Sequence, residues 1–355
     1  MSDHQLEEAF AHWGPRFVSN GVALTDFQEV SRTVKKWDQW CRVWSEKAAV
    51  YEKLGREALD RKKYLSAGEH LQRAGVYYHF AKFLFFVNAE EARTAHAKAV
   101  ECRTAALPYL QPAGERVAVP YEGDVLYGIL RKPAGVSKPP IMVMACGLDS
   151  CKEETETYER PYLDRGIATF VFDGPGQGEG EYNHTIRGDY EAVVAAVIDA
   201  LEKRQDIDVA RLGMWGVSLG GYYATRATAF EKRITACVSL GPPYDWADNW
   251  DGLPELTKEA FMVRSGAKSF AEAREKAKLL TLKDAAHRIT CPIFVMNGKL
   301  DRVVPWRDAE RIANEVKGPR ELLLIDDGNH VANNRQFFWK LRAADWMADQ
   351  LKASV

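Results

Sequence analysis

The feature that most constrains the fold is an alternation of short apolar runs with helical segments over the C-terminal two thirds of the chain. The apolar runs are "IMVMAC", "IATFVFD", "RLGMWG", "TACVSL", "PIFVMNG" and "ELLLID". Helical segments are expected at about 186–204, 219–230, 306–316 and 335–352. Continuous apolar strands that alternate with helices are typical of a mostly parallel sheet covered on both faces. The pattern therefore predicts an α/β fold for residues 113–355.

Residues 1–112 predict helices only. In "TDFQEVSRTVKKWDQWCRVW" the apolar residues recur at steps of three and four, which places them on one helical face. Capping-box patterns predict helix starts at Thr25, with Gln28 three residues later, and at Ser66, with Glu69. The helix after Ser66 is apolar on most of its circumference, so we expect it to be buried between partners. An all-helical N-terminal domain is the expected result.

The charge balance and the N-terminal sequence argue against several classes of function. The 355 residues include 48 Lys+Arg and 50 Asp+Glu, so no surplus positive charge is available for nucleic acid. The N-terminal "MSDHQLEEAFAHW" lacks the order of a signal peptide, and no apolar run approaches the ~20 residues of a membrane span. The six cysteines are scattered, as in a reduced, cytoplasmic protein. We expect neither a nucleic-acid nor a membrane partner.

The motif Gly216-Val217-Ser218-Leu219-Gly220 lies between an apolar strand and a helix. The G-x-S-x-G elbow needs this context, because its serine sits on a strained turn and small neighbours let the chain pass closely. A glycine-rich turn before a helix is the structural alternative. We interpret Ser218 as a candidate nucleophile.

A serine hydroxyl needs a base to take its proton and an acid to orient that base. Asp301 follows the strand in "FVMNGKLDRVVP", and His330 follows the next strand in "LLLIDDGNHVANN". Both loops leave the same end of a parallel sheet as Ser218. The alternatives are a turn-forming aspartate and a solvated loop histidine. Asp326 and Asp327 are rival acids, but they are too close in sequence to His330 to reach its far ring nitrogen easily.

Other sites in the same region fit the sequence less well. Cys146 and Cys151 are five residues apart, with no second Cys or His pair nearby, which argues against zinc. "DGPGQGEGE" is glycine-rich but lacks the G-x-G-x-x-G spacing that opens a helix in dinucleotide sites. We expect neither a metal nor an organic cofactor.

Residues 115 to 355 resemble an α/β-hydrolase, because the elbow, the acid loop and the histidine loop occur in the order of that superfamily. The stretches "GLDSCKEE", "FDGPGQGEG" and "GKLDRVVP", with the N-terminal helices, are similar to those of a narrower branch. That branch contains 2,6-dihydroxypseudooxynicotine hydrolase and fungal polyketide-shortening hydrolases. The resemblance implies cleavage of a carbon–carbon bond beside a ketone, without a cofactor. It also implies that residues 1–112 form a cap on the catalytic domain at 113–355. Within that domain the segment at about 243–289 breaks the alternation of strands and helices, which predicts a helical insertion over the site.

The resemblance also assigns an oxyanion hole and a substrate contact. The backbone N–H groups of Leu219, after the nucleophile, and of Leu148, after the third strand, are the expected oxyanion donors. Asp149 stands where the branch has a glutamate that is implicated in catalysis or substrate binding. Four aromatic residues are candidates for lining a pocket, although core packing is the more common role of any one of them: Tyr222, Trp246, Trp250 and Trp306.

The resulting hypothesis is a serine hydrolase that cleaves a C–C bond next to a ketone in a bulky, hydroxyaromatic small molecule. A carboxylesterase acting on a bulky aryl or acyl ester is the first alternative, because the three residues do not distinguish an oxygen from a carbon leaving group. A small-molecule receptor built on a hydrolase fold is the second. A homodimer is compatible with each of these hypotheses.

Overall fold

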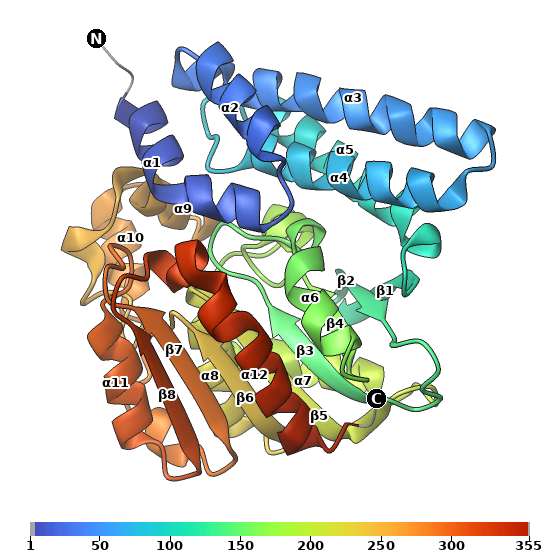
Figure 1. Ribbon diagram of the computed structural model, residues 1–355. Coiled ribbons are helices and arrows are strands. Elements are labelled where there is room, and N and C mark those ends of the chain that lie inside the picture. Colours follow the sequence, from blue (N-terminus) through green and yellow to red (C-terminus); the bar gives the residue numbers. More distant parts are fainter. Residues whose placement is uncertain (1–3, 354–355) are drawn as a thin grey trace. The chain divides into compact units, whose positions relative to one another are not determined.

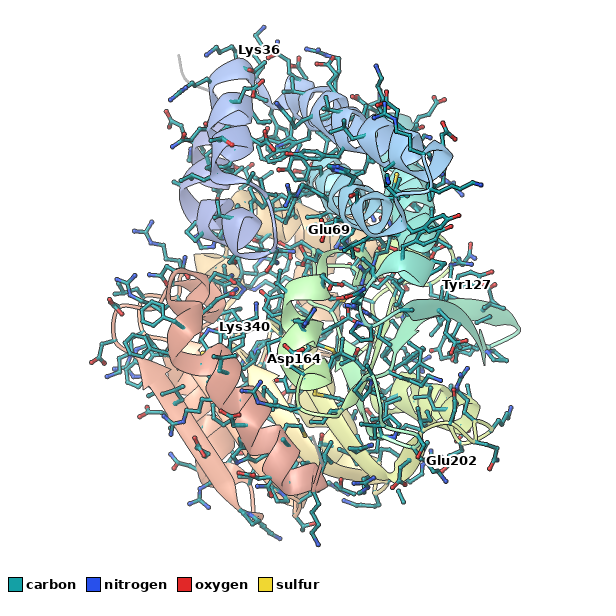
Figure 2. The ribbon with its side chains drawn as sticks, turned by 45° about the vertical axis from the view of Figure 1, so that its right-hand side comes forward. Lys36, Glu69, Tyr127, Asp164, Glu202 and Lys340 are labelled. Carbon is teal, nitrogen blue, oxygen red and sulfur yellow. The ribbon has the colours of Figure 1, made fainter. Side chains whose placement is uncertain are left out.

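A computed structural model describes residues 4–353 of the chain and divides them into two compact units (Figure 1). The helical unit comprises the chain up to Arg116 together with Glu153–Tyr158, and the sheet unit comprises Val117–Lys152 and the chain from Glu159 onward. The sequence placed the domain boundary at residue 112 and did not assign 153–158 to the helical domain. In Figure 2 the labelled Lys36 and Glu69 belong to the helical unit, whereas Asp164 and Glu202 belong to the sheet unit.

The helical unit confirms the prediction of an all-helical N-terminal region. Its helices are α1 (His4–Ser19), α2 (Leu24–Thr33), α3 (Trp40–Asp60), α4 (Tyr64–Lys82) and α5 (Ala89–Ala106). Short 3₁₀ turns lie at Trp37–Gln39 and Leu107–Tyr109. The predicted burial of the second long helix is confirmed, since α4 buries most of its residues from Ala67 to Lys82. Its partners in the core include Phe17, which contacts Phe80 with ring centroids 4.2 Å apart.

Two local predictions in this unit were wrong. The stretch predicted as one continuous helix is broken, because Val34 takes an extended backbone and ends α2. Neither capping box forms: α2 follows Ala23 and α4 follows Lys63, and neither of these residues makes a side-chain cap. At α2 a tertiary contact replaces the local cap, since the N–H of Ala23 donates to the Tyr77 hydroxyl at 3.0 Å. A local sequence pattern does not reveal such long-range contacts.

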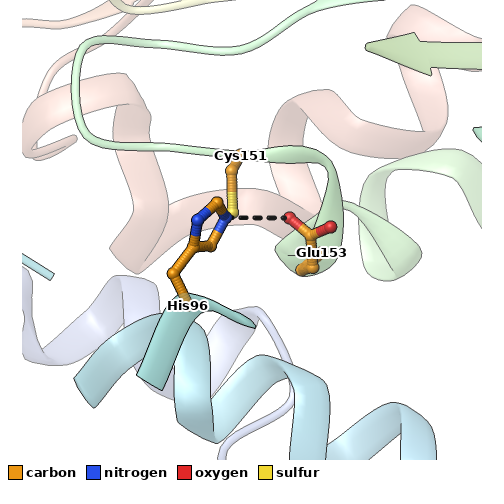
Figure 3. A group of neighbouring side chains, drawn as sticks. All are labelled: His96, Cys151 and Glu153. Atoms are coloured by element: carbon orange, nitrogen blue, oxygen red, sulfur yellow. Dashed lines mark ion pairs between the residues drawn. The ribbon is translucent and has the colours of Figure 1, made fainter. Parts of the chain in front are cut away.

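Buried charges hold the segment Glu153–Tyr158 in the helical unit. The Glu154 carboxylate accepts a hydrogen bond from Arg16 at 2.7 Å and lies 3.0 Å from His79 Nε2. Glu153 lies 3.9 Å from His96 Nε2 (Figure 3). Burial acts to raise the pKa of Glu154, but the charges and hydrogen bonds of Arg16 and His79 outweigh it and lower that pKa to about 2. Glu154 is therefore ionised at neutral pH and contributes to stability.

Glu154→Gln is expected to lower the free energy of unfolding at pH 7 by about 3 to 5 kcal/mol, because Arg16 would remain buried without its anion. The folded-state pKa lies below the ordinary value of 4.5, so the carboxylate stabilises fully above about pH 4.5 and loses its effect as the pH falls toward 2. Urea denaturation should show that the difference in free energy of unfolding between variant and wild type decreases from pH 6 to pH 3.5. Glu46→Gln, in the exposed pair with Arg42, is the control and should cost less than about 1 kcal/mol. A difference in free energy of unfolding that is small or independent of pH would contradict the stabilising role of the ionised Glu154.

The sheet unit carries an eight-stranded sheet in the order β1-β2-β4-β3-β5-β6-β7-β8. The strands are β1 (Gly114–Tyr121), β2 (Asp124–Arg131), β3 (Pro140–Ala145), β4 (Ala168–Phe172), β5 (Asp208–Val217), β6 (Ile234–Leu240), β7 (Ile293–Gly298) and β8 (Arg320–Ile325). β2 runs antiparallel to β4, and β3 to β8 are mutually parallel. The mostly parallel sheet with flanking helices confirms the predicted fold class.

Helices cover both faces of this sheet. α12 (Gln336–Leu351) lies on the near face in Figure 1, and α7 (Glu191–Leu201) and α8 (Leu219–Phe230) lie behind it. α6 (Glu156–Leu163) follows β3, and α11 (Trp306–Glu315) connects β7 to β8. The chain between β6 and β7 contains α9 (Glu255–Arg264) and α10 (Phe270–Ala277), within the range of the predicted insertion. Among residues 4–353 the helices include none with both the length and the apolar character needed to cross a membrane.

The register of the central strands brings three loops together. At the end of β3, Ala145 is paired with Phe172 of β4 on one side and with Gly216 of β5 on the other. The turn after β3, the glycine-rich loop after β4 and the serine elbow after β5 therefore leave the sheet side by side. Carboxyl ends of parallel strands are where such sheets place their sites.

Candidate active site

Ser218 occupies the strained turn between β5 and α8. Its backbone has φ 56° and ψ −125°, outside the regions favoured by an L-residue, and its N–H donates to Leu240 O at 2.7 Å. The two glycines of the motif make this turn possible. A Cβ at Gly216 would lie 1.9 Å from Gly220 O, and one at Gly220 would lie 2.3 Å from Ala145 O. Steric crowding therefore requires glycine at both positions of the motif.

Ser218, His330 and Asp301 form a continuous chain of hydrogen bonds. His330 Nε2 lies 2.9 Å from Ser218 Oγ, and His330 Nδ1 lies 2.8 Å from Asp301 Oδ2. The Asp301 side chain is completely buried and that of His330 is 12% exposed. The structure thus brings together the three residues that the sequence selected from three separate loops.

The backbone holds the Asp301 carboxylate in one orientation. Its second oxygen, Oδ1, accepts the N–H groups of Val303 at 2.8 Å and Val304 at 2.9 Å. Asn297, fully buried at the end of β7, donates from Nδ2 to Val304 O at 3.0 Å and fixes the same loop. These bonds leave Oδ2 directed at His330. No sequence motif pointed to Asn297.

The histidine loop is fixed by asparagines. Asn329 and Asn334 exchange two hydrogen bonds, each from a backbone N–H to the other side chain, at 2.9 and 3.2 Å. Asn333 Nδ2 donates to His330 O at 3.1 Å. The rival acids point elsewhere, since Asp326 pairs with Lys299 and Asp327 with Arg335. Asp301 is therefore the candidate acid that bonds to the ring of His330.

The turn after β3 lies against the serine. A Cβ added to Gly147 would lie 3.3 Å from Ser218 Cβ and 3.0 Å from Val217 O. Leu148, next in the chain, is buried, and Asp149 is partly exposed. Leu219, the other expected oxyanion donor, is the first residue of α8, where helix N–H groups lack partners within the helix. Both expected donors are thus within the neighbourhood of Ser218.

The four aromatic candidates have different surroundings. Tyr222 is fully buried, its hydroxyl donates to Gly188 O at 2.7 Å, and burial raises its pKa. Trp246 and Trp250 both contact Phe261, with ring centroids 5.9 and 5.8 Å apart. Trp306 stands at the start of α11 and stacks with the Arg307 guanidinium at 4.6 Å. Tyr222 therefore has a packing role in this structure, and the tryptophans stay candidates for the pocket.

The glycine-rich loop after β4 supports the turn after β3. Lys152 donates from Nζ to Asp173 at 2.6 Å and pairs with Glu179 at 2.7 Å. These two carboxylates could suggest a cation site, but the Lys152 ammonium already lies between them. The loop "DGPGQGE" therefore clamps the turn through protein contacts.

Comparisons with known proteins agree with this geometry. Residues 27–352 match the model of the family described as esterase FrsA-like. The chain is 35% identical to 2,6-dihydropseudooxynicotine hydrolase of Paenarthrobacter nicotinovorans, over 98% of this chain and 94% of that protein. It is 33% identical to 20-hydroxy-prefusarin hydrolase of Gibberella moniliformis, over 59% of this chain and 53% of that protein.

A solved structure gives the same result. The crystal structure of 2,6-dihydroxy-pseudo-oxynicotine hydrolase superposes with a TM-score of 0.89 and 34% identity, covering 96% of this chain and 97% of that one. The similarity therefore includes the N-terminal helices as well as the sheet. Because the family model spans most of the sequence, and a relative at 35% identity matches it over 98% of its length, the chain belongs to the esterase FrsA-like family and is a hydrolase of the α/β fold.

Proposed function

We propose that this chain is a serine hydrolase that cleaves the carbon–carbon bond beside a ketone in a bulky, hydroxyaromatic substrate. The observation that carries the proposal is the hydrogen-bonded chain from Asp301 through His330 to Ser218, at 2.8 and 2.9 Å. Its similarity to 2,6-dihydropseudooxynicotine hydrolase supports the substrate class. No cofactor takes part in the proposed chemistry.

Attack on the carbonyl begins at Ser218. His330 Nε2 takes the hydroxyl proton as Oγ bonds to the carbonyl carbon, and Asp301 stabilises the imidazolium that results. The carbonyl oxygen becomes an oxyanion, which the N–H groups of Leu219 and Leu148 bind. Because Asp301 is held by two backbone N–H groups, the imidazole keeps the orientation that this step needs.

Collapse of the tetrahedral intermediate breaks the bond between the carbonyl carbon and the ring. The electron pair goes to the ring, and the ring carbon takes the proton of the His330 imidazolium, directly or with Asp149 as a relay, so that His330 is neutral again. A ring hydroxyl ortho or para to this carbon eases the step, because the ring can then take the proton before the bond breaks, as a dienone tautomer. Water then attacks the acyl-serine, with His330 as base, and releases the carboxylic acid.

Asp149 is proposed to serve the ketone reaction only. The leaving group of an ester is an alkoxide or phenoxide, which needs less help from a proton donor than a ring carbanion does. Asp149→Ala should therefore lower kcat/KM for a hydroxyaryl ketone by about 100-fold or more, and for an aryl ester by less than about threefold. Asp149→Glu restores the acid of the related branch and should keep ketone activity. Parallel assays of kcat/KM with both substrates test this role. An equal loss of kcat/KM on both substrates would show that Asp149 has no specific role in C–C cleavage.

The carboxylesterase alternative makes the opposite prediction for the wild type. A carboxylesterase would hydrolyse bulky aryl esters and leave hydroxyaryl ketones intact. The receptor alternative predicts that a fluorophosphonate probe does not label Ser218 in the folded protein. The buried acid and aligned histidine favour labelling, since both activate the serine.

The setting of the enzyme is part of the same proposal. We infer a cytoplasmic enzyme that acts on a small molecule, and its six reduced cysteines support the compartment. A homodimer is the proposed assembly, and light scattering at micromolar concentration would measure it.

A further inference from the structure

Gln177 lies in the loop after β4 and bonds directly to the turn after β3. Its side chain is buried, with the residue 1% exposed. Nε2 donates to Gly147 O at 2.9 Å and also to Cys146 O. One amide group therefore holds two successive carbonyls of the turn that lies against Ser218.

The orientation of this amide is fixed from its other end. Gln177 Oε1 accepts the N–H of Gly174 at 3.3 Å and the hydroxyl of Tyr190 at 3.0 Å. Burial raises the pKa of Tyr190 well above its usual range, so its hydroxyl stays a donor. The Tyr190 ring stacks on Tyr223 with centroids 3.8 Å apart. Since Oε1 is engaged with two donors, Nε2 must be the atom that faces the carbonyls.

The carbonyl of Gly147 and the N–H of Leu148 belong to the same peptide group. A trans peptide is planar, and its C=O and N–H point in opposite directions. A hydrogen bond that fixes the Gly147 carbonyl therefore also fixes the direction of the Leu148 N–H. We propose that Gln177 is a positioning residue that aims the Leu148 N–H at the oxyanion, an inference that rests on the proposed function.

The rest of the turn is held by a different contact. The Lys152 N–H donates to Asp173 Oδ1 at 2.9 Å, and its ammonium bonds to Asp173 and Glu179. The loop thus holds the turn at both ends, and Gln177 bonds to the peptide that carries the proposed donor. Loss of Gln177 should misdirect this N–H while the Lys152 contact still holds the turn in place.

Gln177→Met tests the proposal, because methionine fills a similar volume and cannot donate. The variant should lose about 10- to 100-fold in kcat/KM, less than the roughly 10²- to 10³-fold for a deleted oxyanion donor because the N–H is misdirected and not removed, and lose affinity for an aryl trifluoromethyl ketone by the same factor. That inhibitor forms an oxyanion on Ser218. Affinity for the substrate itself, measured in a Ser218→Ala background, should change less than about threefold, because the ground state makes no oxyanion.

Two further variants separate positioning from stability. Thr169→Val removes a buried hydrogen bond to Glu159, 3.0 Å long, elsewhere in the sheet unit, and should lower stability without changing inhibitor affinity. Gln177→Glu is acceptor-only when ionised, so its activity relative to the wild type should rise as the pH falls and the carboxyl gains a proton to donate. If Gln177→Met fails to fold, Tyr190→Phe, which removes one anchor of the amide, should show a smaller loss of the same kind.

The outcomes distinguish the two levels of the proposal. A wild type that does not bind the trifluoromethyl ketone through Ser218 would overturn the proposed function. A wild type that binds it, with Gln177→Met binding equally well, would overturn only the role of Gln177. A loss of substrate and inhibitor affinity by the same factor would show a general packing role instead.

Discussion

Replacement of Ser218 by alanine is expected to lower kcat by at least about 10⁴-fold, because the Ser218 hydroxyl is the proposed nucleophile that forms the acyl intermediate. The hydroxyl is the only atom removed, and it lies 2.9 Å from His330 Nε2. The elbow is built by the glycines and the backbone bonds at Ser218, which alanine retains. Turnover of a hydroxyaryl ketone and thermal unfolding, measured together, should show lost activity with an intact fold.

The matched control for this variant is Ser239→Ala. Ser239 is fully buried on β6 and shares hydrogen bonds with Thr225 and Gly221, but none with His330 or Asp301. It should lower stability modestly and leave kcat within about threefold of the wild type. Activity of Ser218→Ala near the wild-type level would refute the nucleophile assignment.

Asp301→Asn is expected to lower kcat by about 10⁴-fold through the histidine tautomer. The asparagine oxygen should keep the site of Oδ1, because the N–H groups of Val303 and Val304 point at it. Its NH₂ group would then replace Oδ2 and donate to His330 Nδ1. The ring proton would move to Nε2, which could no longer accept the proton of Ser218.

Asp326→Asn is the control, because Asp326 lies four residues from His330 and pairs with Lys299 instead. Its kcat should stay within about twofold of the wild type. Equal activity losses in both variants would mean that the acid has been misassigned.

The parts predicted from sequence are those with a local pattern. The α/β fold followed from apolar runs that recur between helices, and the sheet confirms it. Ser218, Asp301 and His330 were selected because each follows a strand in a parallel sheet, where loops converge. Their placement in one hydrogen-bonded chain agrees with that selection, and their roles stay predictions.

The parts not predicted depend on contacts distant in sequence. Gln177 reaches back thirty residues to Gly147, and a glycine-rich stretch gives no sign of that bond. Glu154 joins the helical unit through Arg16, 138 residues away. The start of α2 was misplaced for the same reason, since Tyr77 supplies the partner that a local cap would have given. The periodicity of apolar residues indicates local secondary structure, and it does not indicate which residues distant in sequence are in contact.

The central claim is that Ser218 carries the acyl half of a cleaved ketone. Rapid acid quenching of the wild-type enzyme with a dihydroxyphenyl alkyl ketone, followed by intact-mass and peptide-mapping spectrometry, tests it directly. We predict a mass increase equal to the acyl group on the peptide that contains Ser218, with the dihydroxybenzene released in a burst of one equivalent. Release of the arene with Ser218 unmodified at every time point, or no cleavage of the ketone alongside rapid ester hydrolysis, would contradict the account.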